Sequence, residues 1–443
     1  MTHSEHHENT TMLTDTPMVI FGEDWGGHPS STQHLARELS KFHEITWVNS
    51  IGMRSPKLSV DDLSRVVNKG WRMINPSPQL TPEEANHQNP LNKKAPTDWQ
   101  PTVVDPVAIP FHGNKGVRWL NEKLIKQRLY SAQASLAQQK PILWLSLPSA
   151  VPLLGQVNEC FTIYYCGDDF TALEGVDHDV IEKLEDELVE KADLILAASE
   201  TLLNKFPREK TLFIPHGVAD YFFEAPGKRP DDLPDGPVAG FYGSISSWLD
   251  QEMLARTAKN LPHWNFVLIG QVRCDVSVLQ ALPNIHFLGE KTHQQLPDYV
   301  HHWQVSLLPF KDNAQIQACN PLKLREYMAV GKPIVATDFP ALLPYRNWIK
   351  VSLPSDHAGF SELIQKAAAD IPLVDQLVMD KAGLNLFDVV TDWSDIQRMQ
   401  SHSSRRKEQV TDQSWRARAL LVEREIMRRL QGAESGGDEC EVI

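Results

Sequence analysis

Two parts of the chain repeat one pattern, a short apolar strand followed by an amphipathic helix, and a segment that can form neither element separates them. The first repeat runs from a strand at 18–22 through helical spacing at 35–42 to a second strand at 44–51. The separating segment, 224–237, is rich in proline and glycine. We therefore expect an α/β protein with two Rossmann-like doubly wound domains that face a cleft.

The same alternation places the remaining elements. Expected strands are 141–147, 160–166, 193–197 and 211–215 before the linker, and 238–245, 265–270, 285–290, 305–310, 333–337 and 349–352 after it. A helix is expected at 181–191, and Ser30 or Ser31 can cap the first one. Residues 75–105 have no periodicity and predict a long loop.

These elements give a layout of six parts, which are a disordered leader (1–16), an N-terminal domain (17–223), the linker (224–237), a C-terminal domain (238–372), a returning segment (373–432) and a disordered acidic tail (433–443). The returning segment ends in an amphipathic helix from Trp415 to Leu430, which Gly432 is expected to end.

Charge and cysteine content exclude several classes of protein. Lys and Arg number 43 against 57 Asp and Glu, which gives a net charge of −14 and argues against a nucleic-acid partner. The 5 cysteines are scattered and predict neither a disulfide framework nor a zinc site. With no apolar leader or span in the sequence, we expect a cytoplasmic location.

The most informative segment is 320–337, which marks the ends of its own helix. Asn320 suits the N-cap, Pro321 the first helical position, and Gly331 the left-handed residue after the helix. Lys323 and Arg325 stand in the first turns, where the helix dipole disfavours cations. A bound diphosphate would resolve that conflict, and the alternative is a solvated helix end with two surface cations.

Residues 321–337 (PLKLREYMAVGKPIVAT) resemble the donor-site signature of GT-B glycosyltransferases, in particular the retaining family-four type. Residues 241–245, 266–270 and 282–289 occur in the order expected of that family's C-terminal domain. Residues 214–220 resemble its junction segment, with His216 in place of Asn. The chain is also similar to cytoplasmic transferases of bacterial exopolysaccharide or teichuronic-acid assembly.

The resemblance implies a glycosyltransferase that moves a sugar from a nucleotide-diphosphate sugar to the hydroxyl of a saccharide or lipid-linked saccharide in cell-surface polysaccharide assembly. The nucleotide sugar enters as substrate, and we expect no cofactor and no metal. The predicted donor-binding residues are Gly243, Ser244, Asn320, Pro321, Leu322, Lys323 and Glu326, with Glu326 accepting hydrogen bonds from ribose hydroxyls.

Two departures from the family pattern keep other functions open. Ala318 stands where the family carries the first of two glutamates, and residues 243–248 hold no cation. A transferase-like scaffold that has lost catalysis is therefore one alternative. A nucleotide-sugar epimerase, which resembles the same two-domain fold, is another.

On the N-terminal side, the loop after the first strand is a candidate acceptor site. It comprises Asp24, Trp25, Gly26, Gly27 and His28, and His112 is a further candidate from a later loop. The alternatives are a plain strand-to-helix turn and a surface histidine.

Asp168 and Asp169 close another strand and are candidates for the active-site acid. Alternatively, Asp169 only caps the following turn. The predicted catalytic set is Asp168, Asp169, Lys323 and Glu326. The last helix carries arginines 416, 418, 424, 428 and 429, which predict either peripheral contact with anionic lipid or a solvated basic face.

Overall fold

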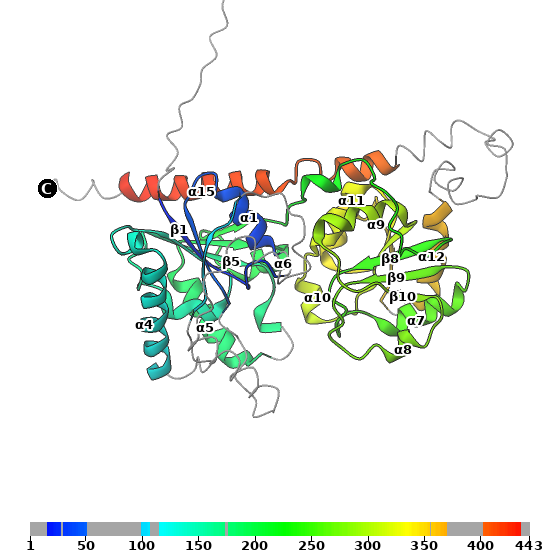
Figure 1. Ribbon diagram of the computed structural model, residues 1–443, viewed down its shortest axis with the longest axis horizontal. Coiled ribbons are helices and arrows are strands. Elements are labelled where there is room, and N and C mark those ends of the chain that lie inside the picture. The colour runs from blue at the N-terminus through cyan, green and yellow to red at the C-terminus, as the bar shows by residue number, and fades with distance from the viewer. Residues whose placement is uncertain are drawn as a thin grey trace, which may run out of the picture.

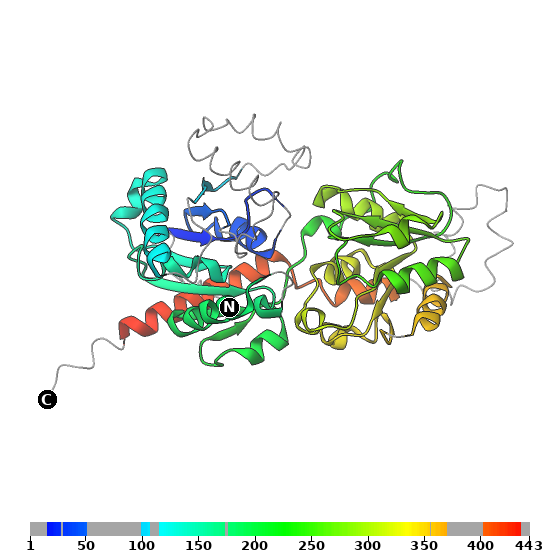
Figure 2. The ribbon, with the colours of Figure 1, turned by 90° about the horizontal axis from the view of Figure 1, so that it is seen from below.

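The computed structural model describes residues 16–27, 30–50, 99–106, 115–172, 176–354, 356–369 and 402–435, in two α/β units joined side by side (Figures 1 and 2). Several predictions lie outside these residues. They concern His28, His112, most of the loop at 75–105, residues 373–401, leader residues 1–15 and tail residues 436–443, whereas tail residues 433–435, predicted to be disordered, are helical.

The N-terminal unit is built on a parallel sheet of seven strands in the order β3-β2-β1-β4-β5-β6-β7. The strands are β1 Met18–Phe21, β2 Ile45–Val48, β3 Thr102–Val104, β4 Ile142–Leu145, β5 Phe161–Cys166, β6 Leu194–Ala197 and β7 Thr211–Phe213. Strand β3 corrects the prediction of a loop up to residue 105. Because Val103 and Val104 pair with Trp47 and Val48, this short stretch forms a sheet edge despite its polar neighbours.

Helices cover both faces of that sheet. They are α1 Ser31–Leu39, α4 Lys115–Ala132, α5 His178–Lys191 and α6 Glu200–Lys205, with 3-10 turns at Ala134–Ala137, Pro148–Leu153, Phe170–Ala172 and Asp220–Phe222. Ser30 caps α1, since its side chain accepts a hydrogen bond from the Gln33 amide. Most strand residues are fully buried, as expected for a sheet covered on both faces.

The C-terminal unit repeats the design with a six-stranded parallel sheet in the order β10-β9-β8-β11-β12-β13. Its strands are β8 Val238–Tyr242, β9 Asn265–Ile269, β10 Ile285–Phe287, β11 Val305–Leu308, β12 Ile334–Thr337 and β13 Lys350–Ser352. Its helices are α7 Gln251–Asn260, α8 Ser277–Gln280, α9 Leu296–His302, α10 Ala314–Ala318, α11 Leu322–Val330 and α12 His357–Ala369, with 3-10 turns at His293–Gln295 and Pro340–Tyr345. Two doubly wound sheets confirm the predicted fold class.

Helix α15, Trp415–Ser435, leaves the C-terminal unit and lies along α1 of the N-terminal unit (Figure 1). Its buried Glu423 carboxylate lies 2.8 Å from the His43 ring nitrogen Nε2. The prediction that Gly432 ends this helix is wrong. The helix continues to Ser435, because a single helical glycine costs only about 1 kcal/mol relative to alanine.

The arginines of α15 do not form one solvated face. Arg429 donates to the main-chain oxygens of Asp193 and Glu209, and both Arg428 and Arg429 pair with Glu425. Within the described residues, no helix combines the length and the apolar character that crossing a bilayer requires.

A cleft of about 830 Å³ lies between the two units. Residues that follow β1, β5, β8, β9 and β10 line it, so the carboxyl ends of strands in both sheets contribute to its walls. Ligands of open α/β sheets bind at this position, and the volume is in the usual range for small-molecule sites.

Candidate active site in the cleft

The first turn of α11 opens onto the cleft. Pro321, Leu322 and Lys323 line it. The predicted boundary is wrong by one residue, because Pro321 is the N-cap and no side chain caps the helix. The leading N–H groups of a helix lack intrahelical acceptors, so this turn presents donors and a positive dipole end to the cleft. Gly331 adopts the predicted left-handed conformation at the other end, with φ of 84°.

Lys323 is held by three aromatic rings. Its Nζ atom lies 5.2 Å from the Phe241 ring centre, 5.4 Å from that of Trp248 and 5.6 Å from that of Phe310. Burial lowers the pKa of Lys323, while the charges of Glu326 and Asp168 act against that shift. The ammonium group is therefore partly desolvated and fixed in direction, which strengthens its attraction for an anion.

Gly243 makes room for this lysine. It has a φ of 130°, and a β-carbon there would lie 2.9 Å from both Cε and Nζ of Lys323. Gly243 and its neighbour Ser244 line the cleft as predicted donor-site residues. Any side chain at position 243 would displace the ammonium group.

Glu326 lies one turn further along α11 and is almost fully buried, with 1% of its surface exposed. Its Oε1 atom accepts from Nε2 of His293 at 2.7 Å, and its Oε2 atom accepts from the Tyr242 hydroxyl. The other ring nitrogen of His293 is hydrogen-bonded to the Tyr221 hydroxyl. Both carboxylate oxygens therefore have protein partners, and each keeps a second lone pair for a ligand hydroxyl.

Asn320 lies outside the lining of the cleft and joins the two units instead. Its Nδ2 atom donates to the Ala198 main-chain oxygen at 2.6 Å, and its Oδ1 atom accepts from Arg325 at 2.7 Å. Arg325 also donates to the Gln413 side chain, so its charge is used inside the protein and is not offered to a ligand. The prediction that Asn320 caps the helix and lines the donor site is therefore wrong, since its side chain is used at the junction by a residue 122 positions away.

His216, which replaces the family's asparagine, is also buried at this junction. Its Nδ1 atom lies 2.7 Å from the Ser31 hydroxyl. Burial, together with the charge of Arg325, lowers the pKa of His216 to about 3. The ring is therefore neutral at physiological pH and serves the packing of the junction.

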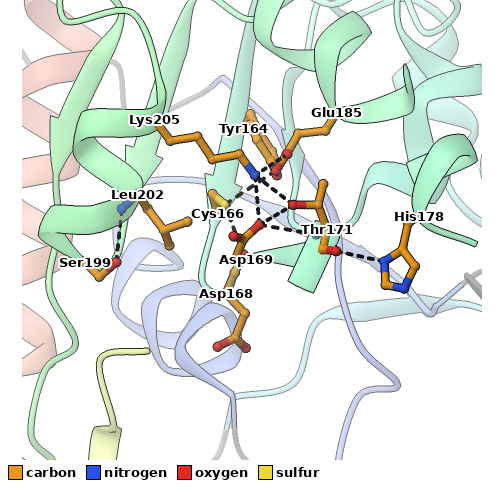
Figure 3. Close-up of polar contacts among 10 residues, drawn as sticks. All are labelled: Tyr164, Cys166, Asp168, Asp169, Thr171, His178, Glu185, Ser199, Leu202 and Lys205. Atoms are coloured by element: carbon orange, nitrogen blue, oxygen red, sulfur yellow. Dashed lines mark hydrogen bonds and ion pairs between the residues drawn. The ribbon is translucent and has the colours of Figure 1, made fainter. Parts of the chain in front are cut away.

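The two neighbouring aspartates point in opposite directions (Figure 3). Asp169 accepts from Lys205 at 2.8 Å and from the Thr171 hydroxyl at 2.7 Å, and these bonds lower its pKa. Asp169 thus caps the following turn, as the alternative prediction stated, and it does not line the cleft. Asp168 points away from that cluster and lines the cleft.

Asp168 has an unusual electrostatic setting. Desolvation by the surrounding protein, followed by the nearby charge of Glu23, raises the pKa of Asp168 to about 6, and Lys323 opposes the shift. The side chain nevertheless remains open to solvent in the cleft. A carboxylate of the N-terminal unit thus faces the lysine of the C-terminal unit, and a pKa shifted toward neutrality in a cleft is typical of functional groups.

Of the described residues in the predicted acceptor loop, some line the cleft and others support the loop. Gly26 and Gly27 line the cleft. Asp24 instead accepts from the Ser50 amide and hydroxyl, and Trp25 packs on the rings of Trp47 and Trp99. Asp24 and Trp25 therefore belong to a strand-to-helix turn, which was the alternative to an acceptor-binding role for these two side chains.

Sequence reasoning missed several side chains of the cleft, namely His34, Arg37, Tyr221, Tyr242, His293, Trp415 and Arg416. The spacing of His34 and Arg37 on one face of α1 was the available signal. Among the described residues, no group of three His, Cys, Asp or Glu side chains is arranged to hold a metal ion.

Two Rossmann-like units that face one cleft place this chain in the GT-B class of α/β folds. HepE of Anabaena, solved in complex with UDP-glucose, is 11% identical with a TM-score of 0.58, over 94% of this chain and 99% of that one. Sucrose-phosphate synthase of Thermosynechococcus elongatus is 14% identical with a TM-score of 0.59, over 94% of this chain and 100% of that one. At such identities the likeness establishes the fold.

Sequence comparison adds two matches to known proteins. Residues 236–370 match the family model described as Glycosyl transferases group 1, which covers the whole C-terminal sheet and α11. The chain is also 30% identical over 231 residues to TuaH of Bacillus subtilis (strain 168), whose name assigns it to teichuronic acid biosynthesis as a glycosyltransferase. That alignment covers 47% of this chain and 58% of the relative.

Proposed function

We propose that the protein transfers a sugar from a nucleotide-diphosphate sugar to the hydroxyl group of an acceptor. The observation that carries this proposal is the first turn of α11, which presents Lys323 to a cleft between two Rossmann-like units. The match of residues 236–370 to group 1 glycosyltransferases supports it, as does the UDP-glucose bound to the similarly folded HepE.

On the donor side, the departing diphosphate is the group whose negative charge grows during the reaction. Lys323 and the free N–H groups at the start of α11 are the chain's own groups for stabilising that charge. The three rings around Lys323 fix its direction before the substrate arrives, so little reorganisation is needed. Glu326 accepts hydrogen bonds from the ribose hydroxyls in this scheme, while His293 and Tyr242 hold it in place.

On the opposite wall, Asp168 acts as a carboxylate. Positive charge develops on the sugar ring as the leaving group departs, and an anion on that side of the cleft stabilises it. Gly26 and Gly27 allow the acceptor to approach closely from the same wall. We retain Asp168 in the proposed catalytic set and leave out Asp169, which is bonded to Lys205.

The proposed setting is cell-surface polysaccharide assembly in the cytoplasm, with a saccharide or a lipid-linked saccharide as acceptor. The name of TuaH supports this setting, although the chain spans only 58% of that relative's length. The family resemblance implies retention of the anomeric configuration.

Calorimetry with UDP, GDP and their sugars, followed by an assay of donor hydrolysis, tests the proposal. We expect one nucleotide series to bind and its sugar to be cleaved slowly without acceptor. A chain that binds no nucleotide would exclude the transferase.

Ala318 supports a second candidate, a scaffold without catalysis. It occupies the position of the family's first glutamate, it is buried, and the lining of the cleft does not include it. The same experiment separates the two candidates, because a scaffold would bind nucleotide sugar tightly and leave it intact over hours.

A further inference from the structure

Two arginines on the N-terminal wall of the cleft have no counter-charge. Arg37 comes from α1, Arg416 comes from the first turn of α15, and both line the cleft. Among the described residues, neither side chain has a hydrogen bond or an ion pair, and the Nε atom of Arg37 is shielded from solvent without a partner. The Arg37 guanidinium group lies 5.7 Å from the centre of the Trp25 ring, a contact that leaves its charge without an anionic partner.

This arrangement is costly for the free protein. A guanidinium group removed from water normally requires a charged or hydrogen-bonding partner, and buried N–H donors are rarely left unpaired. Arg416 adds a second conflict, because it stands in the first turn of a helix, where the dipole is already positive. Further along the same helix, Arg428 and Arg429 have the expected partner in Glu425.

The fold brings together the two helices that carry these arginines. The ring of His34 stacks on that of Trp415 with centres 4.8 Å apart and planes 2° from parallel, which joins α1 to the start of α15. Arg37 follows His34 by three residues on α1, and Arg416 directly follows Trp415. Two helices that are distant in the sequence thus lie side by side, and each contributes one arginine to the lining of the cleft.

The carboxylates of the same wall do not neutralise this pair. Glu38 is bonded to Lys41 at 2.5 Å, and neither Asp220 nor Asp168 forms an ion pair with either arginine. The donor diphosphate already has Lys323 and the α11 turn on the other wall. A neutral acceptor sugar would leave both guanidinium groups uncompensated when the cleft fills.

We propose that Arg37 and Arg416 bind an oxyanion carried by the acceptor, a carboxylate or phosphate group close to the hydroxyl that receives the sugar. This inference rests on the proposed function and narrows its acceptor to an anionic saccharide. Guanidinium groups suit such a ligand, since their paired N–H donors match two oxygens of a carboxylate or phosphate.

Binding of matched probes to the full chain, with and without saturating UDP, tests this inference. The first pair is 4-nitrophenyl β-D-glucuronide against the corresponding glucoside, and the second is glucose 6-phosphate against glucose. We expect one anionic probe to bind at least about tenfold more tightly than its neutral partner, and the pair that shows the effect distinguishes carboxylate from phosphate.

The variants R37Q and R416Q should each reduce that preference by about tenfold while UDP affinity stays within about twofold. R424Q is the matched control, because Arg424 is an exposed residue of the same helix away from the cleft. R416Q replaces a solvent-exposed side chain, so it tests the inference even if R37Q does not fold.

Equal affinity for charged and neutral probes would overturn the inference, and so would an equal loss in R424Q. A large loss of UDP affinity in R37Q or R416Q would assign the arginines to the donor and also overturn it. Failure of wild-type protein to bind any nucleotide would instead count against the proposed function, and the probe preference measured without UDP keeps the two failures distinct.

Discussion

The two walls of the cleft are built in different ways. The C-terminal wall presents its key groups on one short helix, with Lys323 and Glu326 one turn apart and Gly243 beneath the lysine. The N-terminal wall combines side chains from the loop after β1, from α1, from the end of β5 and from the start of α15. Most of the proposed donor site therefore comes from one unit, whereas the proposed acceptor wall, which is the N-terminal wall, combines segments that only the complete fold brings together.

Replacement of Lys323 is the sharpest test of the donor wall. Lys323→Ala should lower turnover of the donor by about 10²- to 10³-fold, because a positioned cation for the leaving diphosphate is lost. Thermal unfolding should change little, and the exposed Lys311→Ala variant should behave like wild type in both measurements. Wild-type hydrolysis by the Lys323 variant would remove this residue from the mechanism.

Asp168 tests the acceptor wall. The rate of Asp168→Asn at pH 8 should fall by about 10- to 100-fold, since a charge that stabilises the sugar cation is lost. In the wild type, kcat/KM should rise as the pH passes through about 6, the raised pKa of Asp168, because the ionised form is the active one. The Asn variant should lack that rise, and a profile that keeps it would assign the titration to another group.

His293 connects the two walls, since it is hydrogen-bonded both to Glu326 and to Tyr221. His293→Asn should raise the KM for the donor by about five- to tenfold and change kcat less, because Glu326 loses a donor that positions it. The exposed His263→Asn variant is the control. An unchanged KM would show that Glu326 does not need this partner.

Replacing Asp168 and replacing Asp169 by asparagine should have opposite effects on the free energy of unfolding. Because the pKa of Asp168 is raised to about 6, ionising it costs the folded state free energy. This cost grows as the pH rises from the ordinary carboxyl pKa to about 6 and is complete above that, so Asp168→Asn should stabilise the protein at pH 8 and not at pH 4. The gain should stay below about 1 kcal/mol, because solvent in the cleft screens the charge.

The lowered pKa of Asp169 means that its ionised form stabilises the fold above the ordinary carboxyl pKa and that this contribution is lost as the pH falls. Asp169→Asn should therefore cost about 1 kcal/mol at pH 8 and leave the rate within about twofold. Chemical denaturation at both pH values measures these changes. Equal effects of the two substitutions would contradict the division seen in Figure 3.

The difference between the walls also explains what the sequence could predict. The α11 segment encodes its glycine end and, to within one residue, its start, so local rules placed Lys323 in the first turn and Gly331 at the end correctly, although the predicted Asn320 cap is wrong. The strand alternation similarly predicted every strand of both sheets except the edge strand β3. The hydrogen bonds that Arg325 donates to Asn320 and Gln413 could not be predicted, because they depend on tertiary contacts between separate segments of the chain.

The acceptor wall shows the same limit more strongly. Asp168 and Asp169 have the same chemistry and adjacent positions, and the bonds of Asp169 to Lys205 on α6 and to Thr171 accompany the orientation that leaves Asp168 to the cleft. His34 and Trp415 are far apart in the sequence, and no local pattern indicates that their rings stack. Pairings of this kind become visible only once α15 is placed against α1.

The chain crosses between the two units twice, and the two crossings are hydrogen-bonded to each other. The Val218 amide donates to the Gln413 oxygen at 2.8 Å, and Val218 and Ser414 form a parallel bridge. Hinge motion between domains takes place about a few loop or element-terminal residues, and this single bridge is such a point between the two units. Any hinge motion would change the distance between Lys323 and Asp168 on the two walls while the bridge keeps the crossings together.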